Sequence, residues 1–296
     1  EQVRLELELL RGSDGRSEWR EEYLHPRASL TSVLDPVLAA VRSELLPDLP
    51  PGPLDPIVRA TALAQSLYLE SRGTREFSPE DRARNVALLE RAVAEDPAFA
   101  LGWAALANAR RARYQHGDTN LEEAMTGAQE AIDRALALDP DLVEALVVQC
   151  FIKTNQWRTA EALGPSRRAY ELAPNDPRAV GVRANVLGYL GRPRESLALR
   201  QRAVELNPLW WGPVWSMATD YLMLGDRERA LAQIAAARGM VGGETDAGVF
   251  GARLELAFGQ PAQALLRFRQ GLPSQVSFSI ILRTVEVQAL AAIGQV

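Results

Sequence analysis

A short phrase that ends in proline returns at a fixed interval and constrains the fold more than any other feature of the chain. It reads ALALDP at 135–140, AYELAP at 169–174 and AVELNP at 203–208, so each proline follows the previous one by 34 residues. A period of this length is typical of a repeated unit built from two short helices and their turns. Because proline ends helices, we expect each of these prolines to close one unit.

Columns of small side chains support this register. If the first helices begin near residues 100, 143, 177, 211 and 245, a small residue recurs at three places in the units. The eighth place of the first helix holds Ala107, Cys150, Ala184, Ala218 and Ala252; the facing place on the second helix holds Ala128, Ala162, Ser196, Ala230 and Ala264; the place where the next unit packs holds Ala92, Ala135, Ala169, Ala203, Ala237 and Gly271. Because small side chains let two helix axes approach closely, the columns predict about five stacked helical hairpins.

Two segments of the array resemble the tetratricopeptide-repeat (TPR) family. They are GYLGRPRESLALRQRAVELNP (188–208) and DYLMLGDRERALAQIAAA (220–237), with Gly191, Gly225 and Gly259 in the turn between the paired helices. The resemblance extends from about Asp55 to the C-terminus and implies a mainly α fold, a right-handed TPR-type α-solenoid. It implies protein binding in general rather than one ligand, because this scaffold serves many partners.

The first residues follow a different pattern. VRLELELL (3–10) and SEWREEYL (17–24) alternate apolar and polar side chains around a Gly-containing turn, which predicts a β-hairpin. An amphipathic helix is expected over 30–46. A hairpin and one helix are too small to bury a core alone, so we expect them to form part of a larger α+β domain or to pack on the solenoid.

Residues 3–45 resemble the last hairpin and helix of the TolB-N/FlgO-like α+β domain. Ser13-Asp14-Gly15, Trp19 and Glu22-Tyr23, followed by the helix, carry the resemblance. This domain precedes TPR arrays in bacterial CadC-type transcription activators, class III adenylate/guanylate cyclases and Ser/Thr kinases. Its strand–helix–strand portion is absent, and the chain begins at Glu1 rather than Met, so an upstream segment is expected.

These observations predict three segments. Residues 1–46 form the C-terminal part of the TolB-N/FlgO-like domain, residues 47–56 form a Pro-rich linker, and residues 57–296 form the TPR solenoid with a final helix over 278–293. The unit that closes at Pro140 is nine residues longer than the others, and we expect the additional residues in a loop at 113–123.

Composition and motifs argue against several functions. The net charge of −5 and a pI near 5.3 disfavour direct nucleic-acid binding, and no apolar run is long enough for membrane insertion by this region. One cysteine excludes an internal disulfide, and Cys150 is expected to fill space at a helix crossing. His25 and His116 lack triad or metal-ligand spacing. We therefore predict no catalytic residue, metal or cofactor, and a chain that is not an enzyme.

The concave groove is the remaining candidate site. In the TPR family, places two, five, nine and twelve to thirteen of each first helix usually point into it. Side-chain amides there pair with an extended peptide, and arginines grip carboxylates; the alternative is a groove lining without a ligand. Lys153 is the only lysine, so the carboxylate-clamp set of the family is not reproduced. The candidate residues are Asn108, Arg111, Phe151, Asn155, Arg178, Asn185, Tyr189, Trp215 and Arg253.

The sequence thus favours a non-enzymatic protein-interaction scaffold, the C-terminal sensing or assembly region of a bacterial signalling or transcription-regulatory protein. Its partner would be a protein or peptide, possibly a second copy of itself. Two alternatives stay open: a small-ligand sensor near the Pro-rich linker, and a homodimerisation module attached to an upstream cyclase, kinase or winged-helix effector. The protein would lie in the cytoplasm or on the periplasmic side of a membrane-anchored signalling protein.

Overall fold

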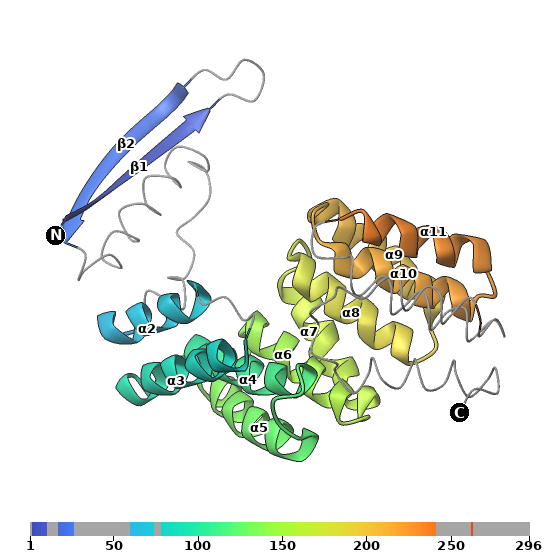
Figure 1. The fold of residues 1–296 in the computed structure, drawn as a ribbon, viewed down its shortest axis with the longest axis horizontal. Helices are drawn as coiled ribbons and strands as arrows, with labels where there is room; N and C mark the ends of the chain where they lie inside the picture. Colours follow the sequence, from blue (N-terminus) through green and yellow to red (C-terminus); the bar gives the residue numbers. More distant parts are fainter. Residues whose placement is uncertain (1, 11–16, 27–59, 74–77, 241–261, 263–296) are drawn as a thin grey trace.

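The computed structural model describes residues 2–10, 17–26, 60–73, 78–240 and 262, and within these it shows one β-hairpin followed by a row of helices (Figure 1). The strands are β1 (Gln2–Leu10) and β2 (Ser17–Pro26). The helices are α2 (Ala62–Gly73), α3 (Pro79–Glu95), α4 (Ala100–Gln115), α5 (Leu121–Leu138), α6 (Val143–Asn155), the 3-10 turn η2 (Thr159–Ala162), α7 (Leu163–Leu172), α8 (Pro177–Tyr189), α9 (Pro193–Leu206), α10 (Trp211–Met223) and α11 (Arg227–Arg238).

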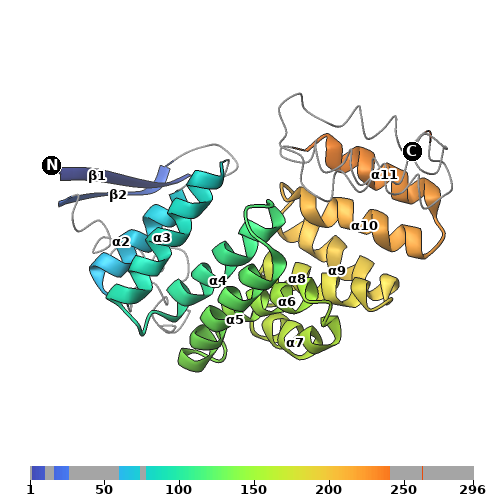
Figure 2. The same cartoon turned by 60° about the horizontal axis from the view of Figure 1, so that its bottom comes forward.

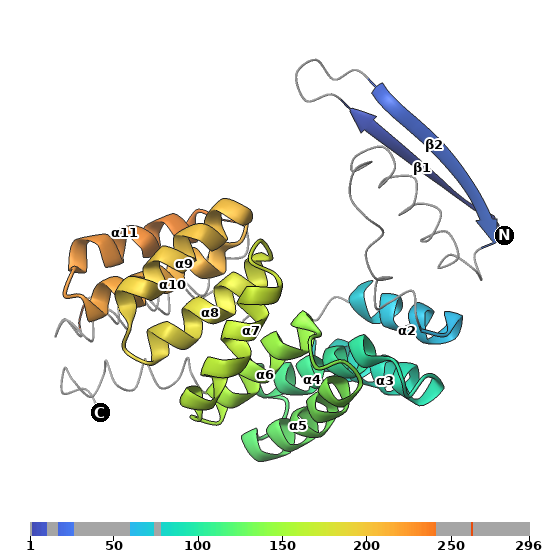
Figure 3. The ribbon, with the colours of Figure 1, turned by 180° about the vertical axis from the view of Figure 1, so that it is seen from behind.

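The β-hairpin lies at the α2 end of the helical array (Figures 1 and 3). Its strands are antiparallel, and their register changes between Leu9 and Leu10. Glu6 stands opposite Glu22, a repulsive pairing, and each glutamate binds an arginine of the other strand: Arg20 pairs with Glu6, and Arg4 lies 2.6 Å from Glu22. The hairpin prediction is confirmed, whereas the expected helix at 30–46 and the Pro-rich linker lie outside the described residues.

The helices pack as consecutive pairs that stack into a curved array (Figure 2). The first helices α4, α6, α8 and α10 contact one another in succession. Among the described elements, the second helices contact mainly their own partner and the next first helix. Because the first helices lie closer together than the second helices, they form the inner, concave side of the solenoid.

The predicted columns of small residues lie at the helix crossings and are buried. In the first column Ala107, Cys150 and Ala184 are 0% exposed and Ala218 is 1% exposed. The second and third columns are equally buried from Ala92 to Ala237. The predicted register is therefore confirmed over units 100–238, while Ala252, Ala264 and Gly271 lie outside the described residues.

Each first helix from α4 onward ends in the same turn, which requires a residue with positive φ. This place is held by Gly117, Trp157, Gly191 and Gly225, with φ values of 79°, 60°, 74° and 76°. The N–H group of the following residue donates to the carbonyl oxygen five residues back at 2.8–3.0 Å, the Schellman arrangement. Glycine was expected at 191 and 225. Trp157 is the one non-glycine residue with positive φ among the residues described.

The longer unit differs from its prediction. The expected loop at 113–123 is wrong in extent, because α4 continues to Gln115 and α5 begins at Leu121. The Asn120 side chain caps α5 by accepting a hydrogen bond from the Glu123 N–H at 2.8 Å. Most of the additional residues therefore lengthen the two helices, and only 116–120 connect them.

Candidate functional site

Among the described residues, two pockets on the concave side are lined mainly by first helices. The amino-terminal pocket has a volume of about 430 Å³ and collects side chains from α2, α4, α6 and α8. Its lining includes the predicted residues Asn108, Phe151 and Arg178, together with Arg72 and Glu144. Side chains predicted from three separate units therefore meet in one cavity.

Arg111 supports this pocket from a nearly buried position. Its side chain is only 7% exposed, and its Nη2 donates to Asn108 Oδ1 at 2.9 Å. The guanidinium carbon lies 5.0 Å from the centroid of the Phe151 ring, within the range of a cation–π contact. Arg111 is thus fixed against two other predicted groove residues.

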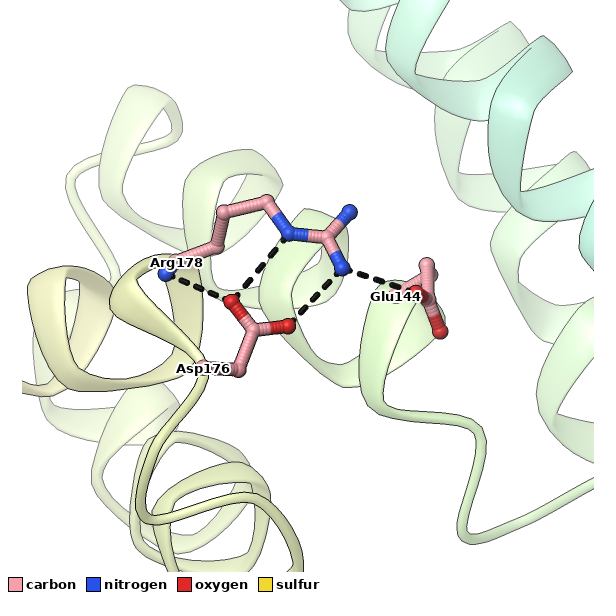
Figure 4. A network of polar contacts seen from close by, with 3 residues as sticks. All are labelled: Glu144, Asp176 and Arg178. Atoms are coloured by element: carbon pink, nitrogen blue, oxygen red, sulfur yellow. Dashed lines mark hydrogen bonds and ion pairs between the residues drawn. The ribbon is translucent and has the colours of Figure 1, made fainter. Parts of the chain in front are cut away.

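Arg178 is held by carboxylates of the protein (Figure 4). Its Nε and Nη2 donate to Asp176 at 3.3 and 2.8 Å, and Nη2 also donates to Glu144 at 2.9 Å. The hydrogen bond with Asp176, supported by Glu144, raises the pKa of the guanidinium above its ordinary value. A ligand carboxylate at Arg178 would have to compete with these two side chains.

The carboxy-terminal pocket has a volume of about 480 Å³ and lies between α8 and α10. Asn185, Tyr189 and Trp215, three further predicted residues, line it together with Met223 and Ile234. Tyr189 is 67% exposed, so its ring lies at the surface rather than in the core. The pocket combines an aromatic and aliphatic wall with polar groups of Asn185, Arg200 and Asp220.

A buried ion pair forms the polar part of this pocket. Arg200 and Asp220 are 5% and 0% exposed, and Arg200 Nε donates to Asp220 Oδ2 at 2.7 Å. The Ser196 hydroxyl donates to the same oxygen at 2.8 Å. Arg200 Nη1 donates to Asn185 Oδ1 at 2.7 Å. One network therefore joins α8, α9 and α10 beneath the pocket.

Arg200 and Asp220 were not among the predicted site residues, although the repeat register contains a signal for both. The place of Asp220 is held in the other units by Ala109, Ile152 and Val186, all buried. The place of Arg200 is similarly buried in the other second helices, for example at Ile132. Charged residues at two buried places predict a pair, because an unpaired buried charge is costly.

The other predicted residues lie elsewhere. Asn155 belongs to neither pocket, and its buried Nδ2 donates to no group among the described residues. Arg253 lies outside the described residues. Trp210 packs across Gly181 of α8, where an added Cβ would lie 2.7 Å from its ring. The rings of Trp211 and Trp215 stack with centroids 6.3 Å apart.

Within the described ranges no group of three or more His, Cys, Asp and Glu side chains could hold a metal ion, and no helix there has the length and apolar character needed to cross a membrane. Burial raises the pKa of the Cys150 thiol to about 12, so this group is a poor nucleophile at neutral pH.

Comparisons with known proteins identify the fold. No family model and no curated protein matches the chain. PilW, a widely conserved type IV pilus biogenesis factor, matches with a TM-score of 0.55 and 20% identity, over 76% of this chain and 99% of that one. PilF of Pseudomonas aeruginosa matches with a TM-score of 0.52 and 18% identity, over 76% and 97%. The TPR protein TTC0263 of Thermus thermophilus matches with a TM-score of 0.52 and 19% identity, over 66% of this chain and 98% of that one.

The array and its neighbours define a TPR-type α-solenoid, a mainly α fold with a small N-terminal hairpin. The structural neighbours are TPR proteins, and the likeness to them shows the fold of the array.

Proposed function

We propose that the protein is a non-enzymatic scaffold that binds an extended peptide segment of a partner protein in its concave groove. The observation that carries the proposal is the convergence of predicted groove residues into two cavities on the same side of the array. Six of the nine line a pocket directly: Asn108, Phe151 and Arg178 in the amino-terminal pocket, and Asn185, Tyr189 and Trp215 in the carboxy-terminal pocket.

The chemistry of the two pockets fits a peptide. Each has an aromatic side chain in its wall, Phe151 or Trp215, which offers a large apolar contact at little entropic cost. Each also has an asparagine at the ninth place of its first helix, Asn108 or Asn185, and amide groups there reach the backbone of an extended chain. Two such sites along one groove favour a ligand that spans several units.

The wider setting follows from the N-terminal resemblance. A TolB-N/FlgO-like hairpin before a TPR array suggests the C-terminal sensing or assembly region of a bacterial signalling or transcription-regulatory protein. In this proposal, occupation of the groove is relayed to an upstream effector domain. Attachment of the array to its natural upstream sequence, followed by measurement of effector output with and without a bound peptide, tests this part separately.

Peptide binding is tested with an immobilised library of acetylated, amidated decapeptides of random sequence. Tyr189→Ala removes an exposed ring from the pocket wall and leaves the core intact, so we expect binding of the selected peptides to weaken roughly tenfold. Tyr170→Ala, on α7 and outside both pockets, is the matched control and should bind as the wild type does. A library without any binder of the wild-type protein, or equal loss in both variants, would contradict the proposal.

A further inference from the structure

The amide of Asn185 has a fixed orientation. Its Oδ1 accepts a hydrogen bond from Arg200 Nη1 at 2.7 Å. A guanidinium group carries donors only, so the amide atom that faces it must be the oxygen. Asn185 lines the carboxy-terminal pocket, and within the part of the chain that the structure describes its Nδ2 donates to no other group. The NH₂ donor is therefore left wholly for a ligand, whereas Oδ1 already has one of its two lone pairs engaged.

Arg200 is itself unable to move away from Asn185. Asp220 Oδ2 accepts from Arg200 Nε at 2.7 Å, and Ser196 Oγ lies 3.1 Å from the same Nε. A Cβ on Gly188 would lie 3.1 Å from Asp220 Oδ1 and 3.2 Å from Arg200 Nη2. The absence of a side chain at Gly188 thus makes room for the pair, and the hydrogen bonds to Asp220 and Ser196 hold the guanidinium beside Asn185.

Asn108 shows the same polarity in the amino-terminal pocket by a different route. Its Oδ1 accepts from Arg111 Nη2 at 2.9 Å, from the next turn of its own helix. Arg111 is nearly buried and lies against Phe151. Two asparagines at the same place of units 100 and 177 therefore have their oxygens occupied, one by an arginine of the same helix and the other by an arginine of α9.

We propose that Asn108 and Asn185 act as one-way hydrogen-bond donors, so that the groove binds an extended peptide through its backbone carbonyl oxygens and not through its N–H groups. This inference rests on the proposed peptide-binding function. An unrestrained asparagine would pair with both a carbonyl and an N–H of the peptide. Arg200, held by Asp220, is a positioning residue: it engages the Asn185 oxygen that would otherwise accept from a peptide N–H.

The net charge of the carboxy-terminal pocket indicates which charge its ligand carries. The buried charges of Arg200 and Asp220 offset each other, so the site offers no net charge to a carboxylate or an ammonium group. A neutral carbonyl oxygen complements the Asn185 donor, and an apolar side chain complements Trp215 and Tyr189. The segment that enters this pocket is therefore an uncharged, extended stretch of peptide.

Asn185→Asp tests the polarity directly. The aspartate keeps the shape and the oxygen that faces Arg200, but it replaces the outward donor with a second acceptor. We expect the library-selected peptides to bind roughly tenfold more weakly or worse, with a melting temperature close to that of the wild type. Asn175→Asp is the control, because Asn175 Oδ1 also accepts from an arginine, Arg202, at 3.1 Å, on the exposed surface outside both pockets.

Peptide analogues test the one-way character. Each backbone N–H of a selected peptide is replaced in turn by an ester oxygen, and binding is measured to the wild type and to Asn185→Ala. An ester also weakens its own carbonyl as an acceptor. If Asn185 donates to one peptide carbonyl and contacts no peptide N–H, the effects of ester and mutation are therefore additive at every position except the one whose carbonyl faces Asn185. A coupling larger than about threefold at a second, neighbouring position shows an N–H bound to Asn185 Oδ1 and overturns the proposal.

The positioning role of Arg200 is tested with the double variant Arg200→Met, Asp220→Leu. Apolar side chains of similar size in place of a buried ion pair commonly preserve or increase stability, so the fold is retained while the Asn185 amide is released. We expect ester coupling at a second, neighbouring position to appear in this variant, an effect that a purely structural pair would not produce. If it does not appear, Arg200 does not orient the amide.

The outcomes separate the two proposals. If no peptide binds the wild-type protein, the peptide-binding function itself fails. If peptides bind the wild type and bind Tyr189→Ala more weakly, but bind Asn185→Asp as tightly as the wild type, the proposed peptide-binding function stands. The proposal that Asn185 acts as a one-way donor then fails.

Discussion

Trp157 occupies a place that the array otherwise gives to glycine, and its replacement should reveal the cost of this exception. Its φ is 60°, and its side chain is 90% exposed. The left-handed conformation costs a residue with a Cβ about 1–2 kcal/mol. A side chain so exposed forms few contacts that could offset this cost. We therefore expect Trp157→Gly to be more stable than Trp157→Ala.

The magnitude follows from the comparison of the two variants. Both lose the same indole contacts, so these cancel in the difference. Alanine keeps the unfavourable backbone conformation, whereas glycine relieves it at the expense of about 0.5–1 kcal/mol of additional chain entropy. The free energy of unfolding of Trp157→Gly should exceed that of Trp157→Ala by about 1 kcal/mol, or about 2–4 °C in melting temperature for an array of this size.

Gly191→Ala provides the matched control at the same place of the next unit. Its φ is 74°, and a Cβ there would meet no atom within 4 Å, so the cost of the substitution is purely conformational. Urea midpoints at unchanged m-value, followed by circular dichroism, should give the same glycine–alanine difference at both sites. If Trp157→Ala is as stable as Trp157→Gly while Gly191→Ala is destabilised, the indole stabilises the turn and the reasoning fails.

Three further predictions concern the interior. Gly188→Ala should lower the free energy of unfolding by about 1–3 kcal/mol, because its Cβ would lie 3.1–3.2 Å from three buried polar atoms. Gly164→Ala, which adds a Cβ in open space on a helix, should instead raise the free energy of unfolding by up to about 1 kcal/mol. Urea unfolding of the two variants measures both effects. Asp118→Asn should cost about 3 kcal/mol, because it breaks the buried pair with Arg82 at 2.5 Å. The hydrogen bond from Arg82 lowers the pKa of Asp118, so this stabilisation is complete above pH about 4 and is lost as the pH falls through the lowered pKa. If the wild type and Asp118→Asn lose stability equally on acidification, the prediction is wrong. The thiol of Cys150 should resist iodoacetamide at pH 8, and its contribution to stability should be lost as the pH rises from about 9 towards 12; rapid labelling of the folded protein would show that the thiol is not buried.

The sequence by itself determined the repeat and its phase. The interval between Pro140, Pro174 and Pro208 located the helix pairs, and the columns through Ala107 and Cys150 identified the crossings that are now seen to be buried. These features were readable because helix termination and close approach depend on one residue type at one place. The expected concave position of Asn108 and Asn185 was what the TPR resemblance implies for the ninth place in this register.

Only the tertiary structure decided how the polar side chains pair. Arg200 and Asp220 lie 20 residues apart on different helices, and their contact depends on how α9 packs against α10. The polarity of Asn185 depends in turn on that contact, because an amide has no preferred direction until a donor or an acceptor faces it. The left-handed conformation of Trp157 was likewise not evident from the sequence. It is set by the turn between α6 and α7, which has the same geometry as the glycine turns of the neighbouring units. Local sequence thus specifies the elements, whereas hydrogen-bond direction requires both partners in place.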